Sequence, residues 1–371
     1  MIVSLTLILF AQLLGEVVAR AAGLPVPGPV IGMALLLGFL VLRDRTAPAS
    51  TRWLPPPLVD GGMEGVAKGL LAHLSIMFVP AGVGIVGKLD VLASHGLALA
   101  VVLCLSVTLT LAATVLTFVA VSRLLERSRR GPDMSGEFAL WVYLTRTPLL
   151  WLTVTLLAYA VADRLFQAAG RHPIVNPVIH AIWMIGLVLT LTGTPYPTYF
   201  QGAQFVHFLL GPATVALAVP LYERRATVMR ALLPMLAALV VGCITAMTSA
   251  LVFAKLAGIP ADVRLAMAPK SVTTGVAMGI VEALGGDPTL AAVLVMLTGM
   301  AGAVIVTPLM RTLRIEDMRA RGFAAGLAAH GLGTARAFQV SEVAGTFAGI
   351  AMGLNAFLTA ILVPVAVSFL R

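Results

Sequence analysis

The sequence predicts an all-α fold, a polytopic bundle of transmembrane helices in which several helices are discontinuous. Of its 371 residues, 59% are hydrophobic and 11% are charged, and the mean hydropathy is +1.00. A soluble domain has roughly 45–50% apolar and about 25% charged residues. Three stretches, residues 97–121, 231–254 and 343–370, contain no Asp, Glu, Lys or Arg. Each exceeds the roughly 20 apolar residues that cross a bilayer, so most of this chain is expected to lie in lipid.

Dividing the remaining apolar stretches by the same length predicts about 12 spanning or half-spanning segments, several of them interrupted by Gly and Pro. The formal net charge of +9 is carried largely by short basic clusters between the apolar runs. Such spacing is typical of cytoplasmic loops under the positive-inside rule, whereas a nucleic-acid-binding protein gathers its basic residues on one face. The lipid bilayer is therefore the predicted partner, and nucleic acid is not. The clusters are Arg43/Arg45, Arg127/Arg129/Arg130, Arg224/Arg225 and Arg311/Arg314/Arg319/Arg321.

The N-terminus enters the apolar pattern at Ile2, without a basic leader or an Arg- and Ser-rich presequence. This start disfavours a cleaved signal or a transit peptide, so a multi-pass protein of the bacterial plasma (inner) membrane is expected. Cys104 and Cys243 lie inside apolar runs, and the sequence has no clustered Cys/His set, phosphate loop, nucleophile elbow or His-Glu-x-x-His motif. We therefore predict no metal, no cofactor and no enzymatic activity, with an intramembrane hydrolase as a minor alternative.

A charged, Pro-bearing linker, residues 124–146, separates a first membrane unit, residues 1–123, from a longer second unit, residues 147–371. The start of the first unit is echoed in the second. Chance is the alternative explanation, because Pro, Ala and Val are common in membrane proteins, but the matching order of features favours an internal duplication. The matched strings are Ala21-Ala-Gly-Leu-Pro-Val-Pro-Gly-Pro-Val-Ile31 with Ala168-Ala-Gly-Arg-His-Pro-Ile-Val-Asn-Pro-Val-Ile179, and Val79-Pro-Ala-Gly-Val-Gly-Ile85 with Gly211-Pro-Ala-Thr-Val-Ala-Leu217.

Each copy is predicted to run helix, Pro-rich turn, helix, broken helix, long helix. Irregular backbone survives at membrane depth only where protein or a water-filled cavity surrounds it, so broken helices point to a binding site. The predicted breaks lie within residues 69–86, 203–219, 265–284 and 324–338. With every basic cluster on one side of the membrane, the number of apolar segments between Arg146 and Arg224 comes out odd. Either one interrupted segment is re-entrant, or one basic cluster lies on the extracytoplasmic side of the membrane.

The stretch Ala268-Pro-Lys-Ser-Val-Thr-Thr-Gly-Val-Ala-Met278 opens an apolar segment with a lysine and three hydroxyls. A charge at this depth costs roughly 2.5–3.5 kcal/mol, so Lys270 requires a compensating partner. A carboxylate substrate would supply one, helped by donors from Ser271, Thr273 and Thr274 and by the dipole of the half-helix that follows Pro269. The alternative is a lysine that snorkels to the membrane interface.

A second stretch, Ala328-Ala-His-Gly-Leu-Gly-Thr-Ala-Arg-Ala337, places His330, Thr334 and Arg336 around two glycines. Glycines allow the backbone to approach a ligand, and Arg can bind a carboxylate through two parallel hydrogen bonds. His330 is a candidate proton carrier because imidazole titrates near neutral pH, although a lone His is more often a hydrogen-bonded core residue.

In a third stretch, Gln201, Gln204 and His207 follow one another at spacings of three, and Gly211-Pro212 and Thr214 come next. On a helix the three would share one face, and a polar stripe this deep faces either a cavity or a partner helix. Asn355, in the last apolar run, is a weaker candidate of the same kind. Gln12 and Glu16 share a face of the first helix and are also consistent with a contact between subunits.

Residues 1–123 resemble the LrgA/CidA holin-like family, and residues from 140 to the end resemble the LrgB/CidB family. Both units on one polypeptide is the arrangement of the plastidal glycolate/glycerate translocator family, of which this chain resembles a bacterial counterpart. The strings that carry the resemblance in the first unit are Leu24-Pro-Val-Pro-Gly-Pro-Val-Ile-Gly-Met33 and Phe78-Val-Pro-Ala-Gly-Val-Gly-Ile85. Those in the second unit are Leu191-Thr-Gly-Thr-Pro-Tyr196, Phe200-Gln-Gly-Ala-Gln204, Leu210-Gly-Pro-Ala-Thr-Val-Ala-Leu-Ala-Val-Pro-Leu-Tyr222, Ala268-Pro-Lys-Ser-Val-Thr-Thr274, His330-Gly-Leu-Gly-Thr-Ala-Arg336 and Ala351-Met-Gly-Leu-Asn355.

The resemblance implies transport of small 2-hydroxy or 2-oxo monocarboxylates such as glycolate, glycerate, lactate or pyruvate, coupled to H⁺. It also implies an alternative, a holin- or antiholin-like regulator of murein hydrolase activity and cell lysis. A holin needs large oligomers and leakage, whereas a carrier needs saturable uptake by a fixed assembly, of which we expect a homodimer. Buried cations favour the carrier, because a non-selective lesion needs no carboxylate site.

The resulting hypothesis is an alternating-access carrier whose second unit holds the anion site and whose first unit is a scaffold or dimer contact. Lys270 and Arg336 would neutralise the carboxylate. Other polar side chains of the three stretches would hydrogen-bond the hydroxyl or keto group, and they are Ser271, Thr273, Thr274, Thr334, Gln204 and His207. Thr214, His330 and Asn355 complete the predicted substrate-binding set.

Overall fold

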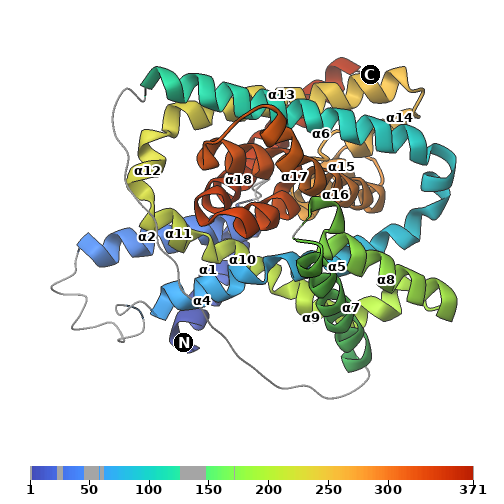
Figure 1. Cartoon of the computed structure of the whole chain (residues 1–371), viewed down its shortest axis with the longest axis horizontal. Helices are drawn as coiled ribbons and strands as arrows, with labels where there is room; N and C mark the ends of the chain where they lie inside the picture. The colour runs from blue at the N-terminus through green and yellow to red at the C-terminus, as the bar shows by residue number, and fades with distance from the viewer. Residues whose placement is uncertain are drawn as a thin grey trace.

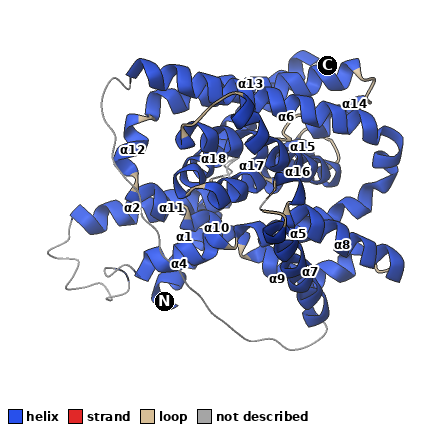
Figure 2. Ribbon diagram, in the orientation of Figure 1, coloured by secondary structure: helices blue, strands red, loops and turns tan. Residues whose placement is uncertain are grey.

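The computed structural model describes residues 2–22, 28–45, 58, 62–125, 148–170 and 172–370. Within these ranges the chain is helical and contains no strand, as Figure 2 shows. The predicted fold class, a bundle of membrane-spanning helices with interruptions, is therefore confirmed. The predicted linker lies almost wholly outside the described residues.

Six helical segments of the described part are long and apolar enough to cross a membrane, and a bent pair brings the total to seven. The number expected from the sequence, about 12, included half-spanning segments, and several apolar stretches do form helices too short to cross a membrane alone. Pro177–Thr192 and Thr274–Ala283 are examples. The six segments are Val3–Ala21, Val91–Ala120, Tyr196–Glu223, Leu232–Leu256, Pro288–Thr312 and Glu342–Pro364, and the bent pair is Gly62–Ala72 with Leu74–Lys88.

Two copies of one element order fill residues 2–256. The first repeat consists of α1 (Ile2–Ala21), α2 (Gly28–Arg45), the broken helix α4 (Gly62–Ala72), η2 (Leu74–Phe78), α5 (Val79–Val83) and η3 (Gly84–Lys88), and the long helix α6 (Leu89–Leu125). The second repeat consists of α7 (Pro148–Ala168), α8 (Pro177–Thr192), the broken helix α9 (Tyr196–Phe208), α10 (Leu210–Ala216), α11 (Ala218–Glu223) and α12 (Arg225–Arg230), and the long helix α13 (Leu232–Leu256). This order is the one that the matched sequence strings predicted.

Proline explains where the two repeats break. Pro80 and Pro212 lie in the first turns of α5 and α10. Proline has no backbone N–H, so it cannot continue the hydrogen-bond ladder of a preceding helix, but it fits the start of a new one.

The two repeats pack on each other reciprocally. The broken helix of the first contacts α8, and the broken helix of the second contacts α2. Gly82 lies against Ile182 and Gly211 against Gln12, so closely that an added Cβ would overlap the neighbouring side chain. The long helices α6 and α13 lie side by side, and Figure 1 shows them running in opposite directions along the top of the view. Opposed, interlocked copies are typical of inverted-repeat membrane proteins.

The remaining helices, α14–α18, form a central bundle, of which α15–α18 are labelled in the middle of Figure 1 and α14 at the upper right. Here a broken helix followed by a long helix occurs twice. The first set is α14 (Ala261–Met267), α15 (Thr274–Ala283) and α16 (Pro288–Thr312). The second is α17 (Met318–Val340), which is interrupted at Ala329 and His330, and α18 (Glu342–Leu370). All four predicted breaks are thus present.

Small residues allow α17 and α18 to approach each other. Gly322 and Gly326 are one turn apart on α17, and an added Cβ at either would overlap the backbone of α18 at Ala344 or Ala348. This is the spacing with which membrane helices reach backbone-to-backbone contact.

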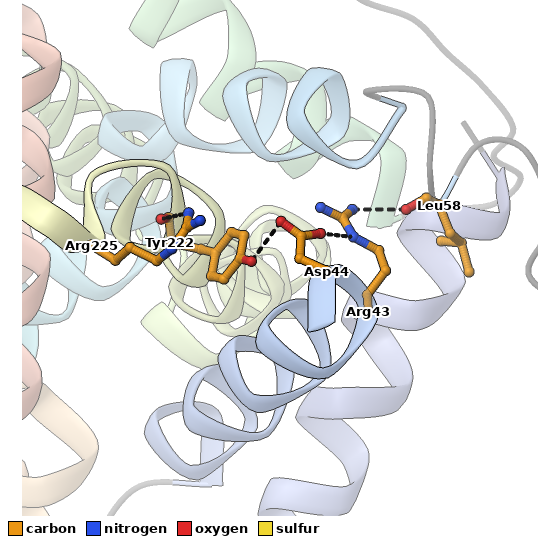
Figure 3. A network of polar contacts seen from close by, with 5 residues as sticks. All are labelled: Arg43, Asp44, Leu58, Tyr222 and Arg225. Atoms are coloured by element: carbon orange, nitrogen blue, oxygen red, sulfur yellow. Dashed lines mark hydrogen bonds and ion pairs between the residues drawn. The ribbon is translucent and has the colours of Figure 1, made fainter. Parts of the chain in front are cut away.

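A polar network ties the first repeat to the second at one end of the molecule (Figure 3). The hydroxyl of Tyr222 on α11 donates to the Asp44 carboxylate on α2 at 2.6 Å. Arg43 donates to the same carboxylate at 2.9 Å and to the Leu58 carbonyl at 2.8 Å. The guanidinium of Arg225 stacks over the Tyr222 ring, 4.2 Å from its centroid. These contacts fix α2 against α11, whose neighbours line the cavity described next.

Candidate functional site

The first break of the central bundle holds a lysine without a neighbouring carboxylate. Lys270 is 0% exposed, and its Nζ donates a hydrogen bond to the Ser271 hydroxyl at 3.3 Å. No Asp or Glu of the described chain forms an ion pair with it. Thr273 is extended, and α15 begins at Thr274 without a side-chain cap on its first backbone amides. A buried amino group and free helix N–H groups both favour an anion.

The second break is built around His330. Its backbone has φ 40° and ψ −131°, a conformation that side chains other than glycine rarely adopt and that costs about 1–3 kcal/mol. The ring is buried, and its Nε2 donates to the Val295 carbonyl at 2.9 Å, so this nitrogen carries the proton. Thr334 donates to the His330 carbonyl at 2.9 Å. Gly299 lies so close to the ring that an added Cβ would contact it at 2.7 Å.

Asn355 of α18 joins the two breaks. Its side-chain amide donates to the Ser271 carbonyl at 3.1 Å and to the Leu327 carbonyl at 3.2 Å. Its side-chain oxygen accepts from Thr359 at 3.2 Å. One buried side chain therefore donates to a carbonyl at each break, which matters because an unpartnered carbonyl inside a membrane is costly.

The two breaks also align in sequence without a gap. Lys270 takes the position of His330, and Thr274 takes the position of Thr334, within strings that share two further alanines. The central bundle thus presents two related broken helices, and the starts of their second halves, at Thr274 and Gly331, line one cavity.

A cavity of about 880 Å³ lies against these helix starts. Thr273, Thr274 and Gly275 line it from α15, and Gly331 lines it from α17. The opposite wall comes from the first repeat and from the broken helix of the second. The lining residues there are Gln12, Glu16, Gly28, Pro29, Val30, Leu74 and Phe78 of the first repeat and His207, Phe208, Leu210, Gly211, Thr214 and Leu217 of the second.

The sequence-predicted residues fall into three groups around this cavity. Some line it, some are buried directly behind its wall, and two lie elsewhere. The lining group is Thr273, Thr274, His207 and Thr214, the group behind the wall is Lys270, Ser271, His330, Thr334 and Asn355, and the residues elsewhere are Gln204 and Arg336.

Comparison with known proteins agrees with this architecture. Residues 155–369 match the LrgB-like family, and residues 12–118 match the LrgA family. The chain belongs to the LrgB-like family and carries an LrgA unit ahead of it. Both families are multi-pass membrane proteins of the holin-like or transporter type.

Two proteins of Bacillus subtilis (strain 168), YxaC and YwbG, are similar to the LrgB unit. Each is 34% identical to this chain over 219 residues, which is 59% of this chain. The alignment covers 95% of YxaC and 97% of YwbG, so both relatives correspond to the LrgB unit alone. No solved structure matches the chain.

Arg336 of the LrgB unit is not brought to Lys270. Its guanidinium donates to Gln339 at 3.2 Å and to Thr307 at 3.4 Å, and it lies 5.7 Å from the centroid of the Phe166 ring. Thr307 is twelve residues beyond the α16 carbonyl that holds His330, a rise of about 18 Å. In this conformation, therefore, Lys270 and Arg336 do not lie close enough to bind one carboxylate together, contrary to the prediction from the sequence.

Gln204 also faces away from the cavity. The predicted helix is present as α9, but Gln201 and Gln204 are exposed on its outer side, and Gln204 donates to the Gln201 carbonyl at 2.7 Å. Of the predicted polar stripe only His207 reaches the cavity. Its Nδ1 is buried without a hydrogen-bond partner among the described residues.

The LrgA unit also contributes to the cavity wall. Gln12 and Glu16, whose shared helix face is equally consistent with a contact between subunits, line the cavity. Glu16 pairs with Arg20 at 3.0 Å, and the Arg20 side chain is 80% exposed, so this wall extends to the surface of the protein. The signal that pointed to these residues was their shared face on an apolar helix, but sequence does not show which neighbour that face meets.

Proposed function

We propose that this protein is a secondary transporter of small 2-hydroxy or 2-oxo monocarboxylates in the bacterial inner membrane. The observation that supports this proposal is the convergence of two half-helix N-termini and a buried lysine at one end of a large cavity. Free helix N–H groups and an amino group are ligands for a carboxylate. The hydroxyls of Thr273 and Thr274, which line the cavity, are candidate donors for a second polar group of the same small acid.

The location of the cavity supports a carrier. Its walls come from separate structural parts, the LrgA unit and broken helix of the second repeat on one side and the central bundle on the other. A binding site between two bodies becomes accessible from alternate sides when one body moves against the other, which is how inverted-repeat transporters work. The volume of the cavity also suits a small-molecule site, because such sites occupy roughly 300–1,000 Å³.

Counterflow in liposomes tests the proposal. Vesicles loaded with unlabelled glycolate and diluted into labelled glycolate should accumulate label transiently and saturably through the wild-type protein. The Lys270→Ala variant should lose this accumulation, because the anion loses its cation. Lys255→Ala is the matched control, since Lys255 is exposed at the end of α13 and should leave counterflow unchanged. Equal counterflow in Lys270→Ala and wild type would refute the site.

The same vesicles distinguish a carrier from a holin-like protein. A carrier retains a trapped dye of several hundred daltons while it exchanges glycolate, whereas a holin-like lesion releases the dye. Retention at every protein-to-lipid ratio supports the carrier. A homodimer, which we also propose, predicts a constant two-chain mass in detergent, in contrast to the large oligomers of a lesion.

A further inference from the structure

The position of Lys270 has a consequence for the coupling ion of the proposed transport. The side chain is 0% exposed, and the cavity reaches the wall at Thr273 and Thr274 but not the lysine itself. Its Nζ donates a hydrogen bond to the Ser271 hydroxyl at 3.3 Å. The amino group is therefore enclosed by protein, and no carboxylate within the described part of the chain forms an ion pair with it.

A charged ammonium group is difficult to keep in such a place. Enclosing one ion without a partner costs several kcal/mol even after the protein relaxes, and a lysine escapes that cost by releasing its proton. A carboxylate that enters the site reverses the balance, because the ammonium then forms an ion pair with it. Occupancy by an anion and protonation of Lys270 should therefore be linked.

His330, the titratable side chain of the second break, is less suited to carry the proton. It lies near enough to Lys270 for the two groups to interact electrostatically, whereas Glu282 of α15 is exposed. The His330 ring is held by its bond to Val295 and by the close approach of Gly299. A second proton on this ring would place a cation beside Lys270 without adding a counter-charge.

We infer that Lys270 is the proton carrier of this transporter, taking up one proton with each monocarboxylate, which makes the transport cycle electroneutral. This inference rests on the proposed function. The lone pair of the neutral Nζ binds a proton from the first side of the membrane, and the resulting ammonium pairs with the carboxylate. On the other side the N–H bond breaks, the proton and the anion leave, and the empty site closes over the neutral amine.

The wall at residues 268–273 must open when substrate binds, because Lys270 is enclosed while that wall is closed. Asn355 holds that wall through the Ser271 carbonyl, and the same side chain holds the second break through Leu327. Opening at one break is therefore mechanically connected to the other.

Net uptake compared with counterflow tests the inference. In counterflow the carrier crosses the membrane loaded in both directions, whereas net uptake requires it to return empty. Arginine stays charged at every relevant pH. Lys270→Arg should therefore keep measurable glycolate counterflow while its ratio of net uptake to counterflow falls about 10-fold or more, the difference that roughly 1.4 kcal/mol makes. Lys255→Arg, the matched exposed variant, should keep the wild-type ratio.

The wild-type protein gives an independent test that does not depend on how Lys270→Arg folds. An inward proton gradient should drive net glycolate uptake, and a potassium potential set with valinomycin should neither raise nor lower it. Uptake driven by the potential, or uptake indifferent to the proton gradient, would overturn the inference even if counterflow is normal. Loss of counterflow in the wild type would instead refute the proposed function.

Discussion

Asn355→Leu is the substitution that most severely tests the architecture of the two breaks. The variant removes the amide that donates to the Ser271 and Leu327 carbonyls and keeps a side chain of similar length. Both buried carbonyls then lose this donor at the two interruptions of the central bundle.

The expected loss of unfolding free energy follows from the number of carbonyls that lose a donor. Each buried acceptor that loses its donor costs about 1–3 kcal/mol, so two carbonyls cost about 2–6 kcal/mol. Thr359→Val is the matched control. It removes one hydroxyl that contacts Asn355 and Cys243 but leaves both donated bonds in place. Its cost should be about 1–3 kcal/mol, because one buried acceptor, the Asn355 side-chain oxygen, loses its donor.

Thermal unfolding of the purified protein in detergent measures the difference. At about 2 °C per kcal/mol for a domain of this size, Asn355→Leu should lower Tm by about 4 °C or more, and Thr359→Val by about half as much. Glycolate counterflow should fall in Asn355→Leu and persist in the control. If Asn355→Leu melts no lower than Thr359→Val, the side chain does not hold the breaks together and the reasoning is wrong.

Three further predictions use other parts of the molecule. Gly331→Ala places a methyl group against the ring of Phe78 at the cavity wall, so it should cost about 1–3 kcal/mol and reduce uptake, and Phe78→Ala in the same chain should restore part of both. Partial burial raises the pKa of Asp287, but hydrogen bonds from Lys88 and from two backbone amides of α16 outweigh this effect and hold that pKa below its usual range. The stability that these bonds contribute is present near neutral pH and is lost as the pH falls through the lowered pKa. Asp287→Asn should therefore show a smaller drop in Tm between pH 6 and pH 3 than the wild type. Tyr222→Phe removes the hydrogen bond to α2 and should destabilise the protein by about 1 kcal/mol in chemical denaturation, and no change would contradict the network of Figure 3.

The sequence predicted the helix breaks well because their causes are local. Pro80 and Pro212 end the ladder of one helix and begin another, and Pro269 precedes the break at Lys270. The matched strings also predicted the order of elements in the two repeats. The number of full spans was harder to predict, because composition does not distinguish one long apolar helix from two short ones joined by a bend.

The site was predicted only in part, because its partners come from distant segments. Asn355 was a weak candidate by sequence, yet it bonds carbonyls 84 and 28 residues away. Arg336 follows His330 closely in sequence, but more than one helical turn separates them, and its guanidinium points to Thr307 at the far end of α16. Gln12 reaches the cavity because α1 packs on α10, a contact that no local pattern reveals.

Protection of a cysteine at position 273 from alkylation is the most direct test of the proposed carboxylate site at the start of α15. Thr273→Cys, in a chain whose Cys104 and Cys243 are replaced, places a thiol on the cavity wall at the start of α15. Ala261→Cys, exposed at the start of α14, is the control position. Saturating glycolate should slow the reaction of a water-soluble maleimide at position 273 several-fold and leave position 261 unchanged. Equal rates at position 273 with and without glycolate, in a protein that still performs counterflow, would show that the acid binds elsewhere.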